Sequence, residues 1–136
     1  MRQEDIEIVR AAVDAANRGD WDAAFKDAAP TFEWDNSRAV GVERAVWTVD
    51  EARQFFTEMT AFWESAGIEI NELIPMGDQV VVPHTTHVRG RDGIEVQART
   101  TWLFTIRTGK IERVCLYQDR REALEAAGLQ EKLSDR

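Results

Sequence analysis

The chain has 136 residues, of which 43% are hydrophobic and 31% are charged, and it carries a net charge of −8 at pH 7. This composition is typical of one globular domain with its own core and excludes a long disordered chain. The acidic charge opposes binding to nucleic acid and to anionic membranes, and no segment approaches the roughly 20 apolar residues that a membrane helix needs.

The first residues and the single cysteine bear on the compartment. Residues 1–5 are charged and lack the apolar run of a signal peptide. Cys115, as the one cysteine, has no partner for an internal disulfide. We therefore expect a cytoplasmic protein with a single domain over residues 1–136 and a polar C-terminal tail from about residue 129.

Helical spacing dominates the first part of the chain. Apolar residues recur three and four positions apart over residues 3–18, which predicts an amphipathic helix that ends in a left-handed cap at Gly19. Asp20 is placed to cap a second, short helix over residues 21–27. A short strand is expected at residues 31–35.

Residues 36–47 show no clear period, and we expect an excursion there that is a candidate cover for a pocket. Thr48 and Glu51 have the spacing of a capping box, so a long helix should begin behind them and run to about Ser65, closed by Gly67. The apolar stripe of this helix consists of Ala52, Phe55, Phe56, Met59, Phe62 and Trp63.

Beyond this helix the period changes from helical to two. Strands are predicted at residues 68–74, 79–89, 94–107 and 111–118, with a hairpin turn at 90–93. A short helix at 120–128 closes the chain. Helices that precede an antiparallel sheet predict an α+β fold in which the helices pack on one face of the sheet.

Alternation along the strands sorts their side chains onto two faces. The expected inner face of strand 94–107 carries Val96, Ala98, Thr100, Trp102, Phe104 and Ile106. On strand 79–89 one face carries Val80, Val82, His84, Thr86 and Val88. On strand 111–118 one face carries Val114, Leu116 and Gln118. Val81, Leu103 and Tyr117 are apolar on the other face. A second subunit is expected to cover them, as a homodimer through the outer sheet face, although a few exposed apolar residues are the simpler alternative.

The order of elements and several short motifs resemble the nuclear-transport-factor-2-like superfamily. The motifs are Asn17-Arg18-Gly19-Asp20-Trp21, Trp34-Asp35, Thr108-Gly109-Lys110-Ile111 and the ending over residues 119–129. Within the superfamily the sequence is most similar to SnoaL-like proteins, related to polyketide cyclases and ketosteroid isomerase. The resemblance covers nearly the whole chain and implies a cone-shaped (cystatin-like) roll, in which a strongly bent antiparallel sheet wraps round a long helix with two further N-terminal helices.

The cone implied by this resemblance holds one cavity. We expect it to be lined by Phe56, Trp63, Val82, His84, Trp102, Leu116 and Gln118, with Thr86 as a further ligand contact. Polar groups in such a cavity would orient a ligand carbonyl or hydroxyl.

Asp35 and His84 are the candidate catalytic residues. The resemblance to ketosteroid isomerase implies that Asp35 is a general base, and nearby aromatic rings would raise its pKa by removing water. The alternative is that Asp35 caps a turn with Asn36 and Ser37. His84 would act as acid or hydrogen-bond donor; the alternative is a buried structural histidine.

The sequence departs from ketosteroid isomerase at its oxyanion hole, which uses a tyrosine and a protonated aspartic acid. The position of the tyrosine corresponds to Ala12 in this sequence, and the position of the aspartic acid falls at or near Thr101 or Trp102. Steroid isomerisation by that mechanism is therefore not expected. His84 and His87 alternate in direction on a strand and have no third ligand, so we expect no metal. The sequence also has no phosphate-binding glycine loop or dinucleotide fingerprint, and we expect no cofactor.

Three functions remain open. The first is binding of a small hydrophobic molecule with cofactor-free proton transfer on a carbonyl compound: an isomerisation, cyclisation or dehydration. The second is a non-catalytic ligand-binding or accessory dimer. The third is an interaction domain that uses the outer face of the sheet.

Overall fold

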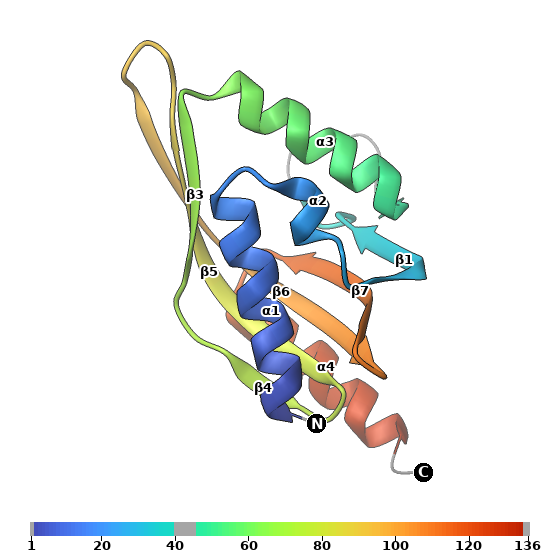
Figure 1. Ribbon diagram of the computed structural model, residues 1–136. Coiled ribbons are helices and arrows are strands. Elements are labelled where there is room, and N and C mark those ends of the chain that lie inside the picture. The colour runs from blue at the N-terminus through green and yellow to red at the C-terminus, as the bar shows by residue number, and fades with distance from the viewer. Residues whose placement is uncertain (1, 40–45, 135–136) are drawn as a thin grey trace.

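The computed structural model describes residues 2–39 and 46–134 and confirms the α+β fold, with a bent, unclosed sheet and several helices (Figure 1). The sheet is built in the order β2-β1-β7-β6-β5-β3, and β4 pairs with β5. The strands are β1 (Ala28–Asp35), β2 (Val46–Trp47), β3 (Ser65–Ile70), β4 (Ile74–Met76), β5 (Gln79–Arg89), β6 (Glu95–Arg107) and β7 (Lys110–Tyr117). Residues 40–45, the centre of the predicted excursion, lie outside the described residues.

The helices are α1 (Arg2–Asn17), α2 (Trp21–Ala24), α3 (Val49–Phe62) and α4 (Arg120–Ser134). Their predicted start and stop signals are confirmed at three places: Gly19 has a φ of 74°, Asp20 accepts from the Ala23 amide at 3.1 Å, and Thr48 and Glu51 form a reciprocal capping box. No helix of the described residues is long and apolar enough to cross a membrane.

Two helix ends differ from the prediction. Helix α3 ends at Phe62, because the Glu64 amide donates to the Arg89 carbonyl at 2.9 Å and the chain begins to pair with β5. Gly67 is therefore a strand residue opposite His87 and not a helix cap. Helix α4 continues through Gly128 to Ser134, where a tail was expected.

The sheet is mixed, whereas the sequence predicted an antiparallel one. Strand β1 runs parallel to β7, with Trp34 beside Val114 and Asp35 beside Cys115, and the other pairs are antiparallel. A parallel pair needs a long crossover connection, and the chain between β1 and β7 supplies it. Local alternation cannot reveal this pairing, because it depends on strands far apart in the sequence.

Helices cover both faces of the sheet. Helices α1, α2 and α3 pack on the inner face, where Val82, Trp102, Phe104 and Val114 are buried. Helix α4 packs on the outer face and contributes Ala123 and Ala127 to a second core, with Val81, Leu103, Cys115 and Tyr117. The apolar outer residues from which a second subunit was predicted are thus covered by the chain's own last helix, so their burial no longer argues for a homodimer.

Asn17, at the end of α1, binds the edge strand β3. Its amide nitrogen donates to the Ile68 carbonyl at 2.9 Å, and its amide oxygen accepts from the Ile68 amide at 2.7 Å. The side chain therefore satisfies both backbone groups of one residue on an edge strand, as a neighbouring strand would. This contact holds α1 against the sheet on one side of the cavity described below.

Replacing Asn17 with alanine should lower the free energy of unfolding by about 1–2 kcal/mol, because two hydrogen bonds are lost together. Urea unfolding measures the change. Asp14→Ala, one turn earlier on the exposed side of α1, is the matched control and should have little effect. Equal stabilities of the two variants would contradict the proposed role of Asn17.

Candidate functional site

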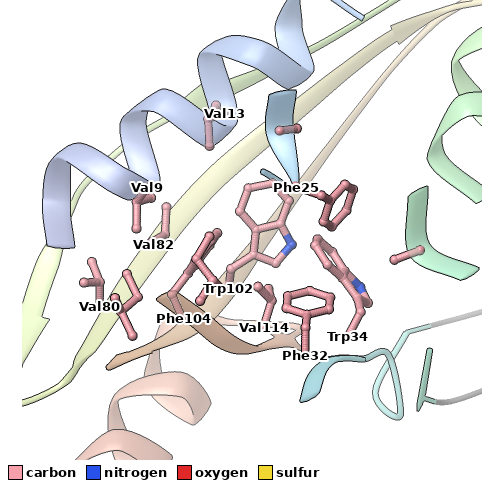
Figure 2. Close-up of a cluster of buried hydrophobic side chains, with 14 of the residues drawn as sticks. Val9, Val13, Phe25, Phe32, Trp34, Val80, Val82, Trp102, Phe104 and Val114 are labelled. Carbon is pink, nitrogen blue, oxygen red and sulfur yellow. The ribbon is translucent and has the colours of Figure 1, made fainter. Parts of the chain in front are cut away.

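An apolar cavity lies between the inner face of the sheet and helices α1, α2 and α3. Figure 2 shows the side chains around it: Phe25, Phe32, Trp34 and Trp102 converge from the C-cap of α2, from β1 and from β6. The full lining consists of Ala12, Val13, Ala16, Trp21, Ala24, Phe25, Phe32, Trp34, Phe56, Ile68, Trp102, Phe104, Ile111 and Val114.

The cavity has a volume of about 50 Å³. That is room for a few water molecules and far below the roughly 300–1,000 Å³ of pockets that hold drug-sized ligands. Most of the gap expected between the long helix and the sheet is therefore filled by aromatic rings. Entry of a ring-sized molecule requires some of these side chains to move.

Phe56 forms the part of the cavity wall that belongs to α3. It projects from α3 and is only partly buried. Its ring lies 5.0 Å from that of Trp21 and 4.8 Å from that of Trp34, measured between centroids.

Two of the three lining indoles use their N–H groups internally. The Trp34 nitrogen donates to the Asn36 side-chain oxygen at 2.8 Å, and the Trp21 nitrogen donates to the Thr60 hydroxyl at 3.0 Å. These bonds fix both rings and leave their hydrocarbon edges to the cavity. The wall they form is apolar.

The structure brings two of the predicted ligand residues, Phe56 and Trp102, to the cavity wall. Val82 is fully buried and Leu116 partly buried in the same core, but neither lines the cavity. Thr86 is partly buried on β5, opposite Ala98 of β6, and is likewise not in the wall.

Trp63 and Gln118 lie away from the cavity. Trp63 follows the last turn of α3 and packs edge-on against Phe62, which is 71% exposed. Gln118 is exposed beyond the end of β7, and its side-chain amide donates to the Arg38 carbonyl. Trp63 follows the end of α3, which stops earlier than expected, and Gln118 follows the end of β7, where it lines a separate hollow together with His84 and Thr100.

His84 lies directly behind the cavity wall. It is 2% exposed, and its ring stacks on that of Trp102 at a centroid distance of 3.7 Å. Nδ1 lies 2.9 Å from the Val82 carbonyl and therefore donates to it, which leaves Nε2 to accept from the Thr100 hydroxyl at 2.8 Å. Burial lowers the pKa of His84 to about 4, although the bond to Val82 favours the charged form. The ring is neutral at pH 7, with both nitrogens occupied.

Asp35 lies on the opposite face of the sheet from His84. Because Trp34 points inward, Asp35 points outward, beside Cys115 of the outer core. Its carboxylate accepts from the Ser37 amide and hydroxyl and forms an ion pair with Arg113. Burial alone would raise the pKa of Asp35, but the Ser37 bonds and the Arg113 charge together lower it. The expected rise is therefore wrong in direction, and the turn-capping alternative matches the observed contacts.

Most of the wall was not singled out from the sequence. Ala12, Val13 and Ala16 belong to the predicted stripe of α1, and Phe32 and Trp34 to the predicted first strand. Their apolar periodicity was visible, but core and cavity residues share that signal. Among the described residues, no group of three or more histidine, cysteine, aspartate or glutamate side chains could hold a metal ion.

This arrangement defines a class of small α+β domains that enclose an apolar cavity between helices and a curved sheet. A family model described as a SnoaL-like domain matches residues 9–114. The chain therefore belongs to the SnoaL-like domain family. A comparison with curated proteins finds no match.

Solved structures with the same fold include TerC co-crystallised with polyporic acid, at 20% identity and a TM-score of 0.73 over 92% of this chain and 98% of that one. A putative polyketide cyclase from Xanthomonas campestris pv. campestris is 22% identical, with a TM-score of 0.68 over 93% and 98% of the two chains. A ketosteroid isomerase-like protein from Catenulispora acidiphila, in complex with trimethylamine, is 18% identical, with a TM-score of 0.72 over 90% and 92%.

Proposed function

We propose that this SnoaL-like domain binds a small, largely apolar molecule in the cavity between its helices and the inner face of the sheet. The observation that carries the proposal is the cavity itself, whose lining side chains are aromatic and aliphatic. Two structures of the same fold, TerC with polyporic acid and the Catenulispora protein with trimethylamine, contain small molecules and support it.

Binding is favoured over proton transfer by the placement of the ionisable groups. No carboxylate or imidazole is among the described residues of the cavity wall. Asp35 and His84, the proposed base and acid, lie on opposite faces of the sheet, and each is already hydrogen-bonded within the protein. A proton-transfer reaction that used both on one substrate would need a large rearrangement, whereas binding needs only the movement of rings.

Titration with ethylbenzene, followed by NMR of the ¹⁵N-labelled indole groups, tests the proposal. The indole signals of Trp21, Trp34 and Trp102 should shift in a saturable manner, because all three rings line the cavity. Trp63 is the internal control and should not shift, since its ring packs on exposed Phe62. Absence of saturable shifts, or equal shifts at Trp63, would contradict binding in the cavity.

A further inference from the structure

Of the three indole donors that line the cavity, that of Trp102 has no partner among the residues that the structure describes. Trp102 is 7% exposed, as buried as Trp34, yet no hydrogen bond from its nitrogen to any described residue is present. A buried N–H group normally finds an acceptor in the protein or in water. This exception calls for an explanation.

The unpaired nitrogen faces the cavity. In Figure 2 it lies on the edge of the Trp102 ring that is directed toward Phe25 and Trp34, two residues of the cavity wall. The nitrogen is also not sealed from water, although the ring as a whole is buried. The donor is therefore accessible to a small molecule in the cavity that Trp102 lines.

The position of the ring is fixed from behind. His84 stacks on Trp102 at 3.7 Å, and His84 is itself held by Val82 and Thr100. On the other side Trp34 meets Trp102 edge to face at 5.9 Å. A donor held in this way is preorganised, so a ligand acceptor that meets it pays little additional ordering cost.

Resting on the proposed function, we propose that Trp102 is the specificity-determining hydrogen-bond donor of the cavity, and that the ligand is an uncharged apolar molecule carrying one acceptor oxygen, such as a carbonyl. The other two lining indole donors are occupied by Asn36 and Thr60, and the remaining lining side chains are hydrocarbon. The wall thus presents a single side-chain donor and, among its described side chains, no acceptor. A ligand with hydroxyl or ammonium donors would leave them unpaired, whereas a lone carbonyl is matched.

The test compares acetophenone with ethylbenzene, two molecules of similar shape that differ in the carbonyl oxygen. Dissociation constants of both are measured for the wild type, for Trp102→Phe and for Trp34→Phe. Trp34→Phe is the matched control, because Trp34 is equally buried and lines the same cavity but already uses its N–H within the protein. The ratio of the two constants removes the loss of indole area that affects both probes, and comparison of this ratio between proteins removes their different hydration.

In Trp102→Phe the ratio should move against acetophenone by roughly fivefold to a hundredfold, the effect of an acceptor left unpaired in an apolar site. In Trp34→Phe it should stay close to that of the wild type. An unchanged ratio in Trp102→Phe would overturn the inference while leaving cavity binding intact. If neither probe binds the wild type, the proposed function fails, and the inference fails with it.

A second measurement uses the wild-type protein and tests the assignment of the Trp102 donor even if Trp102→Phe does not fold. In the ¹⁵N-labelled wild type, the Trp102 indole proton should move downfield with acetophenone but not with ethylbenzene. The indole protons of Trp21 and Trp34 should respond alike to both probes. A Trp102 signal that also responds alike to both would overturn the assignment of the donor.

Discussion

Trp34→Ala should lower the free energy of unfolding by about 3–5 kcal/mol, the range for truncating a large buried aromatic side chain. Trp34 is 7% exposed, and its ring meets those of Phe25, Phe56 and Trp102 at centroid distances of 6.3, 4.8 and 5.9 Å. The substitution removes contacts to all three and leaves a void that adjoins the existing cavity. Urea or thermal unfolding gives the change.

Phe62→Ala is the matched control for this prediction. Phe62 is also an aromatic residue, but it is 71% exposed, so its loss should change stability by less than about 0.5 kcal/mol. Because the void left at position 34 is apolar, ethylbenzene should bind in it and restore part of the lost stability. A Trp34→Ala protein that is as stable as Phe62→Ala would show that the rings around the cavity are not closely packed.

Acidification from pH 6.5 to pH 4 should remove up to about 3 kcal/mol of stability through His84 alone. In the folded chain burial lowers the pKa of His84 to about 4, from an ordinary value of 6.5. Between these two values the unfolded chain binds the proton and the folded chain does not, so the stability falls as the pH falls. The contribution of Asp35, whose pKa is lowered from 3.8, is lost only in stronger acid.

His84→Asn isolates this effect, because asparagine does not titrate and its side-chain amide can still donate to the Val82 carbonyl. The variant should lose less stability than the wild type when urea unfolding is repeated across this pH range. His87→Asn is the control, since the His87 side chain is 44% exposed, and it should retain the steep fall of the wild type. A parallel fall in all three proteins would mean that His84 is not the group responsible.

The predictions for Trp34 and His84 concern neighbouring parts of the same cavity wall. The rings of Trp34 and Phe56 stabilise the fold and also occupy the space that a ligand would need. Variants that enlarge the cavity should therefore bind apolar molecules more readily at a cost in stability. His84 contributes differently: its neutral ring supports Trp102 from behind, so acid should weaken both folding and any binding that depends on the orientation of Trp102.

The elements whose signals are local could be predicted from the sequence. The capping box at Thr48 and Glu51, the left-handed Gly19 and the strand over residues 79–89 each depend on neighbours within a few positions, and each is confirmed. The family resemblance rests on the same kind of short motif and is confirmed over residues 9–114. Phe56 and Trp102 were placed at the cavity because their stripes of apolar residues face inward.

Pairing between segments that are distant in the sequence determined the features that local signals did not predict. Periodicity and capping, which act over a few residues, determined the α+β class and an aromatic inner face, and the resemblance of short motifs indicated the SnoaL-like family. Only the tertiary structure decided that β1 lies parallel to β7 and that α4 covers the outer face. That packing turns Asp35 away from the inner face and toward Arg113, and it leaves the indole nitrogen of Trp102 without a partner among the described residues. These arrangements depend on which apolar surfaces remain exposed once the strands have paired. No pattern within a few residues of the sequence determines them.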